Sequence, residues 1–164
     1  MRKVAYLFAL ACLGCFLFSG ASKAAEPSSG IAGFWKTRDG DAIIEMYPCG
    51  DQFCGRFQWL KDDSPDNPSL DDNNPDPDKR KRPLCGLTFM GGFIKTNEKD
   101  YEKGWIYSPR HGSMFSANLR ILDPDTLEIH GYMLLPLLGE SQIWRRAEAP
   151  VPSCGAESEQ IPKP

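Results

Sequence analysis

The stretch Met114-Phe115-Ser116-Ala117-Asn118-Leu119-Arg120-Ile121-Leu122 is the part of the chain that decides the expected fold. Its odd-numbered positions from Phe115 to Ile121 are apolar, and its even-numbered positions from Ser116 to Arg120 are polar. A period of two residues is the pattern of a β-strand with one buried face and one wet face. The stretch therefore predicts a strand that contributes alternate side chains to a core.

Other short runs of the same kind lie on both sides of this strand. Residues 42–47 are rich in β-formers, residues 53–59 alternate cleanly, and residues 126–130 alternate again. Turn-forming residues separate such runs, for example at 109–112 and 123–125. The chain contains no sustained apolar period of 3.6 residues. About eight short strands predict an all-β domain, either an antiparallel barrel or a sandwich.

The first 24 residues predict an export signal. Arg2 and Lys3 precede an uncharged apolar run over residues 4–18, and small residues stand at Ser22 and Ala24. A run of about 15 residues is shorter than the roughly 20 that a spanning helix needs. We therefore expect cleavage after Ala24 and a mature protein in the periplasm or outside the cell.

Cys12 and Cys15 raise the alternative of a lipoprotein. A cut before Cys15 would leave the apolar residues 16–18 behind, so we favour a cleaved signal without lipidation over a lipoprotein. Residues 25–30 are expected to form a flexible N-terminus, residues 31–147 one folded domain, and residues 148–164 a tail. No segment after the signal is apolar enough to span a membrane.

Cleavage changes the charge of the chain. Loss of Arg2, Lys3 and Lys23 leaves 16 basic against 22 acidic residues, a net charge of −6. Nucleic-acid binding requires a basic surface, so this balance argues against it, and it also disfavours loose adhesion to anionic lipid.

Four cysteines remain after cleavage, and an even number in an exported chain indicates two disulfides, for which sequence alone permits three pairings. Cys49 and Cys54 flank a Gly-Asp turn signal between two strand-like runs, so they are expected to pair. Cys85 would then pair with Cys154 and tether the C-terminal tail. A four-thiolate zinc site is the alternative, but Cys85 and Cys154 lack a partner at the usual zinc spacing of two to four residues.

Residues 61–83 are rich in Asp, Pro and Asn and predict a long surface loop. Residues 72–78 resemble the start of a calcium loop, but Pro77 replaces the required Gly and Pro83 stands where the closing Glu belongs. We therefore expect a proline-braced loop whose basic end, residues 79–82, folds back on its own Asp residues. No cofactor or metal is expected.

Several motifs resemble, in order, the DUF2147 family of bacterial exported proteins. They are GFWKT (33–37), CGDQFCGR (49–56), NPDP (74–77), RPLCGL (82–87), GWIYSP (104–109), GY (131–132) and QIWRR (142–146). The resemblance covers residues 31–146 and implies a compact lipocalin-like (calycin-like) up-and-down β-barrel in the bacterial envelope, for a family whose function is not established. The family typically has an aliphatic residue at Cys85, and the tail with Cys154 lies outside the match.

Lipocalin-like barrels carry a Gly-X-Trp motif on the first strand and an Arg on the last strand that covers the indole. Gly33 and Trp35 supply the first part, and Arg145 or Arg146 supplies the second, with Arg145 as the first choice. Such a cation–π contact contributes about 0.5–2 kcal/mol, which is a structural role in closing the barrel.

A barrel of eight strands is wide enough to hold either its own side chains or one small ligand. Our leading hypothesis is that it binds a small apolar or amphipathic ligand. Aromatic side chains that could line the cavity are Phe57, Trp59, Phe89, Trp105, Tyr107 and Phe115. The alternative is a non-enzymatic module that contacts another envelope protein through residues 62–82, with Asn74, Asp76 and Arg82 in the contact.

A hydrolase is the third hypothesis. The chain has two histidines, His111 in a turn and His130 on a strand face shared with Glu128 and Tyr132. No nucleophile-elbow, HExxH or phosphate-binding glycine motif accompanies them. Both histidines are therefore interpreted as surface residues, and the chain is not expected to be an enzyme.

Overall fold

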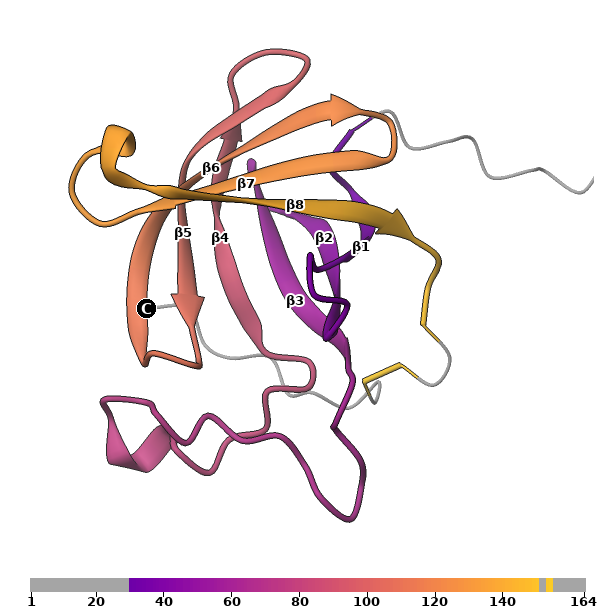
Figure 1. The fold of residues 1–164 in the computed structure, drawn as a ribbon, viewed down its shortest axis with the longest axis vertical. Helices are drawn as coiled ribbons and strands as arrows, with labels where there is room; N and C mark the ends of the chain where they lie inside the picture. Colours follow the sequence, from indigo (N-terminus) through magenta and orange to yellow (C-terminus); the bar gives the residue numbers. More distant parts are fainter. Residues whose placement is uncertain (1–29, 151–152, 155–164) are drawn as a thin grey trace, which may run out of the picture.

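Eight antiparallel strands close into one barrel in the computed structural model, which describes residues 30–150 and 153–154 (Figure 1). Their bounds are Gly33–Lys36 (β1), Ala42–Cys49 (β2), Gln52–Leu60 (β3), Thr88–Lys95 (β4), Asp100–Ser108 (β5), Ser113–Asp123 (β6), Thr126–Tyr132 (β7) and Glu140–Ala147 (β8). Each strand pairs with the next in sequence, and β1 pairs with β8. The predicted up-and-down barrel is confirmed. A sandwich is excluded because one continuous sheet closes on itself.

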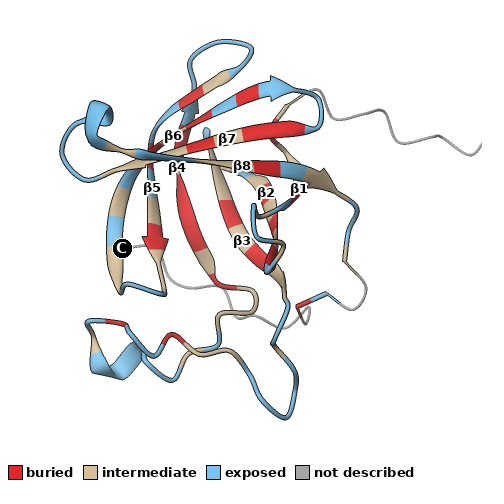
Figure 2. Cartoon of the chain, in the orientation of Figure 1, coloured by how far each residue is buried: buried red, intermediate tan, exposed pale blue. Residues whose placement is uncertain are grey.

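Alternate side chains along the strands point inward and fill the lumen of this barrel. On β6, Ala117, Leu119 and Ile121 are buried, whereas Arg120 is exposed, as the sequence predicts. Figure 2 shows buried positions recurring along strands such as β3, β4 and β7. The large lumen side chains with under 2% exposure are Trp35, Ile44, Met46, Met90, Phe93, Tyr101, Leu119 and Leu127.

The two ends of the barrel differ. The plug end carries the short β2–β3, β4–β5 and β6–β7 turns together with residues 30–32. The loop end carries the β1–β2, β3–β4, β5–β6 and β7–β8 connections, which include two 3-10 turns, η1 (Pro77–Lys79) and η2 (Pro136–Leu138). No helix among the described residues has the length and apolar character needed to cross a membrane.

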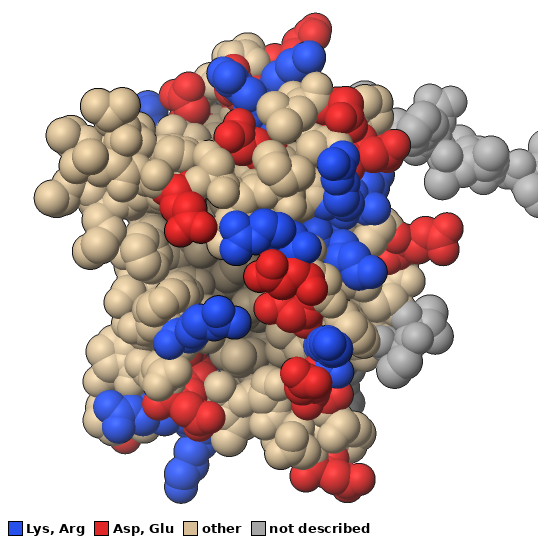
Figure 3. All heavy atoms as spheres, viewed as in Figure 1, with Lys and Arg blue, Asp and Glu red and all other residues tan. Residues whose placement is uncertain are grey.

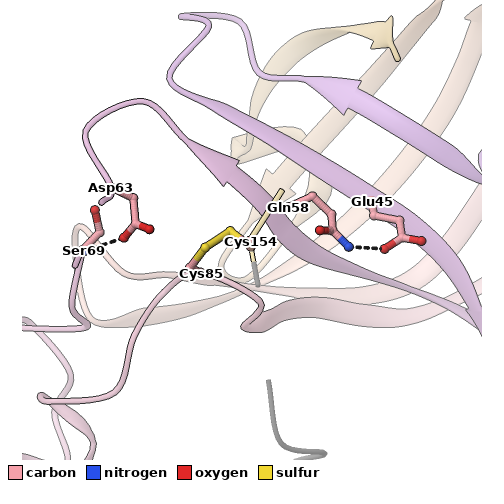
Figure 4. The surroundings of a disulfide bond; sticks show 6 residues. All are labelled: Glu45, Gln58, Asp63, Ser69, Cys85 and Cys154. Atoms are coloured by element: carbon pink, nitrogen blue, oxygen red, sulfur yellow. Dashed lines mark hydrogen bonds between the residues drawn. A yellow bond between two sulfur atoms is a disulfide. The ribbon is translucent and has the colours of Figure 1, made fainter. Parts of the chain in front are cut away.

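Two disulfides brace the barrel, with the predicted pairing. Cys49 and Cys54 bridge the β2–β3 turn with a Cα–Cα distance of 5.8 Å. Cys85 and Cys154 join the C-terminal tail to the segment before β4, with a Cα–Cα distance of 5.2 Å (Figure 4). The backbone N–H of Cys154 also donates to the Gln58 carbonyl at 2.6 Å, which holds the tail against β3.

Candidate functional site

The plug end is sealed by Trp35 and Arg146. The guanidinium of Arg146 lies 4.1 Å from the centroid of the Trp35 ring and donates to the carbonyls of Gly30, Ala32 and Pro124. Burial lowers the pKa of Arg146, and the nearby Asp125 carboxylate opposes that shift. A guanidinium stays protonated in proteins. The plug end is therefore closed by the positively charged Arg146 side chain, which covers the Trp35 ring.

The prediction that Arg145 covers the indole is wrong. Register pairs Trp35 with Arg146, which puts both side chains on the lumen face. Arg145, one residue away, points outward and donates to the Thr126 hydroxyl. The alternation along β8 therefore selects Arg146 from the two consecutive arginines.

The loop end of the lumen is less tightly filled. Ile106 and Phe115 pair across β5 and β6 on the lumen face, and both are partly exposed. Gly131 pairs with the buried Ala117 and therefore also faces the lumen. A Cβ built on Gly131 would meet no atom within 4 Å, so open space lies beside it. The partly exposed Gln142 adds a polar group. These four residues form what we call the mouth.

The aromatic residues predicted to line a cavity divide into three groups. Phe57 and Phe89 lie inside, but they stack on each other at 4.1 Å and act as core. Phe115 faces the lumen at the mouth, and its role in lining a ligand cavity stays a prediction. Trp59, Trp105 and Tyr107 do not line the lumen, so their predicted role is wrong: they face outward.

Local breaks in alternation explain these three errors. Lys103 has a positive φ of 63°, and the β5–β6 register shifts between Tyr101 and Gly104. This bulge keeps Tyr101 and Gly104 inside and turns Trp105 and Tyr107 outward. A second register shift, between β2 and β3, turns Trp59 to the outer face.

Tyr107 is nevertheless buried, because the β3–β4 connection covers it. Its hydroxyl donates to Asp71 at 2.7 Å and accepts from the Asn74 amide at 3.0 Å. Asp71 is fully buried and also accepts from Asn74 and from Arg82, the latter at 2.8–2.9 Å. Burial, and then the hydrogen bond to the Asp71 carboxylate, raise the pKa of Tyr107 to about 12. This network fixes the long loop to the barrel wall.

Two residues of the predicted interaction loop take part in this network. Asn74 is buried, whereas the Arg82 side chain is 30% exposed while it donates to Asp71. Asp76 caps η1 and pairs with Lys79 at 3.1 Å, and this hydrogen bond is the main cause of its lowered pKa. The basic end of the loop does fold back on the loop's own carboxylates, as predicted. Contact with a partner protein through residues 62–82 stays a prediction.

The β7–β8 loop is a surface that the sequence interpretation missed. The exposed side chains Met133, Leu134, Leu135, Leu137 and Leu138 cluster there, next to the mouth. The only sign of it in the sequence is the uncharged run from 131 to 139. In Figure 3 the corresponding protrusion carries no charged residue, and the surface is hollowed beside it.

The two histidines lie on the outside. His111 accepts from or donates to the Ser108 hydroxyl at 2.9 Å in the exposed β5–β6 turn. His130 shares its face with Tyr132, as predicted, and its two ring nitrogens contact the Ser141 hydroxyl and the Pro136 carbonyl. In a Ser-His-acid triad the second ring nitrogen of the histidine contacts a carboxylate, whereas here it contacts the backbone carbonyl of Pro136. Among the described residues, no group of three or more His, Cys, Asp or Glu is placed to hold a metal.

A shallow groove of about 190 Å³ lies on the outer face of β5, β6 and β7. Its walls carry Asp100, Glu102, Arg120, Glu128 and His130. Arg120 donates to Asp100 at 2.6 Å, and this bond is the main cause of the lowered pKa of Asp100. The lining is mostly charged and open to solvent, with Arg120 paired to Asp100, which suits a solvated face better than a site for an apolar ligand.

The closed eight-stranded barrel, sealed at one end by Trp35 and Arg146, has a lipocalin-like fold. The chain is similar to a solved structure from Helicobacter pylori, described as "Protein HP1028 from the human pathogen Helicobacter pylori belongs to the lipocalin family". The TM-score is 0.65 at 21% identity, over 72% of this chain and 83% of that chain. No match was found among curated proteins.

The family model described as "Uncharacterized protein conserved in bacteria (DUF2147)" matches residues 33–146. The chain therefore belongs to the DUF2147 family. The matched region coincides with the barrel, from the start of β1 to the penultimate residue of β8.

Proposed function

We propose that this protein binds a small apolar or amphipathic molecule at the mouth of its barrel, as an exported carrier and not as an enzyme. One observation carries the proposal: the lumen is sealed at the plug end but retains open space at Gly131, beside the partly exposed Phe115. A pocket that is mainly apolar with a few polar groups is the usual form of a small-molecule site.

The packing of the lumen limits the size of the ligand. Trp35, Phe93 and Tyr101 fill the plug-end half, so the ligand would occupy only the loop-end half. A short acyl chain or a single ring fits this depth better than a whole lipid. Its polar group would lie near Gln142 at the rim, where an amide can donate and accept hydrogen bonds.

The test replaces Gly131 by a bulky residue. Gly131→Phe should fill the open space and weaken uptake of a fluorescent fatty-acid probe at least tenfold, because the mouth would be blocked. Ser116→Phe is the matched control, since it places the same ring on the outer face of the neighbouring strand, where Ser116 is exposed and pairs with Tyr132. Native mass spectrometry of the wild-type protein should show a co-purified small molecule.

Two results would contradict the proposal. One is a wild-type protein that neither carries a small molecule nor takes up the probe. The other is probe uptake by Gly131→Phe equal to that of the wild type while both proteins remain folded by circular dichroism.

A further inference from the structure

The β7–β8 loop presents an unusual amount of aliphatic surface to solvent. The exposed fractions are 72% for Met133, 86% for Leu134, 60% for Leu135, 92% for Leu137 and 76% for Leu138. We call these five residues the aliphatic tip. Residues 131–139 contain no charged side chain, and charge begins again at Glu140. A contiguous apolar patch of this kind on a small protein marks an interaction site.

The backbone of the loop is held in place without help from a partner. Within η2, Leu138 donates to the Leu135 carbonyl at 3.0 Å and Gly139 donates to that of Pro136 at 3.2 Å. A ring nitrogen of His130 contacts the Pro136 carbonyl at 2.6 Å. A Cβ on Gly139 would lie 2.5 Å from the Gly131 carbonyl oxygen, so the loop packs tightly against the end of β7. The aliphatic side chains are therefore held outward by structure and not by local fraying.

The size and charge of the tip indicate what covers it. A stable protein–protein interface takes about 20–30 residues a side and has a polar rim around its apolar centre. The tip offers five residues and protrudes from the barrel (Figures 1 and 3). A second copy of the chain or a folded partner would leave much of such a protrusion uncovered. A lipid bilayer needs no matched shape, and its acyl chains accept uncharged aliphatic side chains.

We infer that the aliphatic tip docks the protein on a lipid bilayer surface, with the mouth of the barrel next to the membrane. The tip follows Gly131 of the mouth by only two residues, so docking would bring the mouth close to the lipid. This inference goes beyond the proposed function, because docking requires no ligand in the barrel. It also gives an apolar ligand a route between the membrane and the mouth.

The charges predict how the docking behaves. The tip is uncharged and the mature chain is acidic, so anionic lipid should not strengthen binding. Apolar insertion is not screened by salt, so binding should survive high ionic strength. These two properties distinguish an inserted aliphatic tip from electrostatic adhesion.

The experiment measures co-sedimentation of the exported protein with phosphatidylcholine vesicles. The test variant is Leu134→Ser/Leu137→Ser, which removes two of the most exposed leucines of the tip. The matched control is Ile94→Ser/Leu122→Ser, which removes two exposed aliphatic residues near the plug end. We expect the wild type and the control to bind equally, and the tip variant to bind about 100-fold more weakly, at about tenfold per leucine.

The outcomes are separable from those for the ligand. Wild-type protein that fails to bind phosphatidylcholine vesicles, or a tip variant that binds like the wild type, overturns the inference. Tip-dependent self-association in sedimentation velocity without vesicle binding would instead assign the tip to a second copy, and this also overturns it. Probe uptake by Leu134→Ser/Leu137→Ser in the absence of vesicles reports on the mouth alone, so failure of docking and failure of ligand binding can be told apart.

Discussion

At the scale of single residues, two consecutive arginines have different roles because a strand alternates. Arg146 connects β8 to residues 30–32 and to the β6–β7 turn through three carbonyl hydrogen bonds. Arg145 remains on the outer wall beside Thr126. Hydrogen bonds from a charged donor contribute about 1.5–3 kcal/mol each, and the contact with Trp35 adds about 0.5–2 kcal/mol. Closure of the plug end therefore depends mainly on the side chain of Arg146.

Tyr107 gives a pH-dependent prediction at the same scale. Below pH 10 its phenol is protonated in the folded and unfolded chains, so its contribution to stability is complete. Between pH 10 and about 12 the unfolded chain releases the proton while the folded chain keeps it. The free energy of unfolding should then fall by about 1.4 kcal/mol per pH unit from this group.

The measurement is urea unfolding of the wild type and Tyr107→Phe from pH 9 to 11.5. At pH 9 the variant should be less stable by about 1–3 kcal/mol, because the buried Asp71 loses a donor. The difference in free energy of unfolding between the wild type and Tyr107→Phe should decrease by about 2 kcal/mol by pH 11.5. Tyr132→Phe, on the outer face, should follow the wild type. If the free energies of unfolding of the wild type and Tyr107→Phe instead change with pH in parallel, the Tyr107 phenol does not titrate as described.

At the scale of elements, the two disulfides should stabilise the fold unequally. Cys85 and Cys154 are 69 residues apart in sequence, whereas Cys49 and Cys54 are 5 apart. Closing the longer loop removes more conformational entropy from the unfolded chain, about 4 kcal/mol against about 2 kcal/mol in the chain-entropy model. Cys85→Ser/Cys154→Ser should therefore lower the free energy of unfolding more than Cys49→Ser/Cys54→Ser, as measured by urea titration. Equal losses would contradict this account.

The same elements show what the sequence can and cannot predict. Strict alternation in β6 was sufficient to identify its lumen face. The Gly-Asp turn signal between Cys49 and Cys54 correctly favoured one of the three possible disulfide pairings. Alternation failed for Trp105 and Tyr107, because the bulge at Lys103 depends on pairing between strands and leaves no mark in composition. The mouth was also beyond prediction, since open space at Gly131 depends on how distant side chains pack. The aliphatic tip was visible as an uncharged run, but its exposure was not.

At the scale of the whole molecule, the barrel is asymmetric along its axis. The plug end is closed by short turns, Trp35 and Arg146, and the loop end carries the mouth and the aliphatic tip. The long β3–β4 connection is fixed to the wall through Asp71 and does not depend on a partner for its shape. The features proposed to act on a ligand and a membrane are thus at one end, and the main closure of the barrel is at the other.

The last prediction concerns export of the chain, which we propose from its first 24 residues. When the full chain is expressed with its own N-terminus, we expect the purified protein to begin at Ala25, because the small residues Ser22 and Ala24 precede the cut. Its intact mass should be four hydrogens below that of the reduced chain 25–164, and iodoacetamide should add nothing before reduction, since all four remaining cysteines are paired.

Ala24→Leu should slow cleavage, whereas Lys23→Leu should not, because the residue between the two small positions is not recognised. A mass that includes residues 1–24, or a lipid on Cys12 or Cys15, would contradict the prediction and would supply a different membrane anchor from the aliphatic tip.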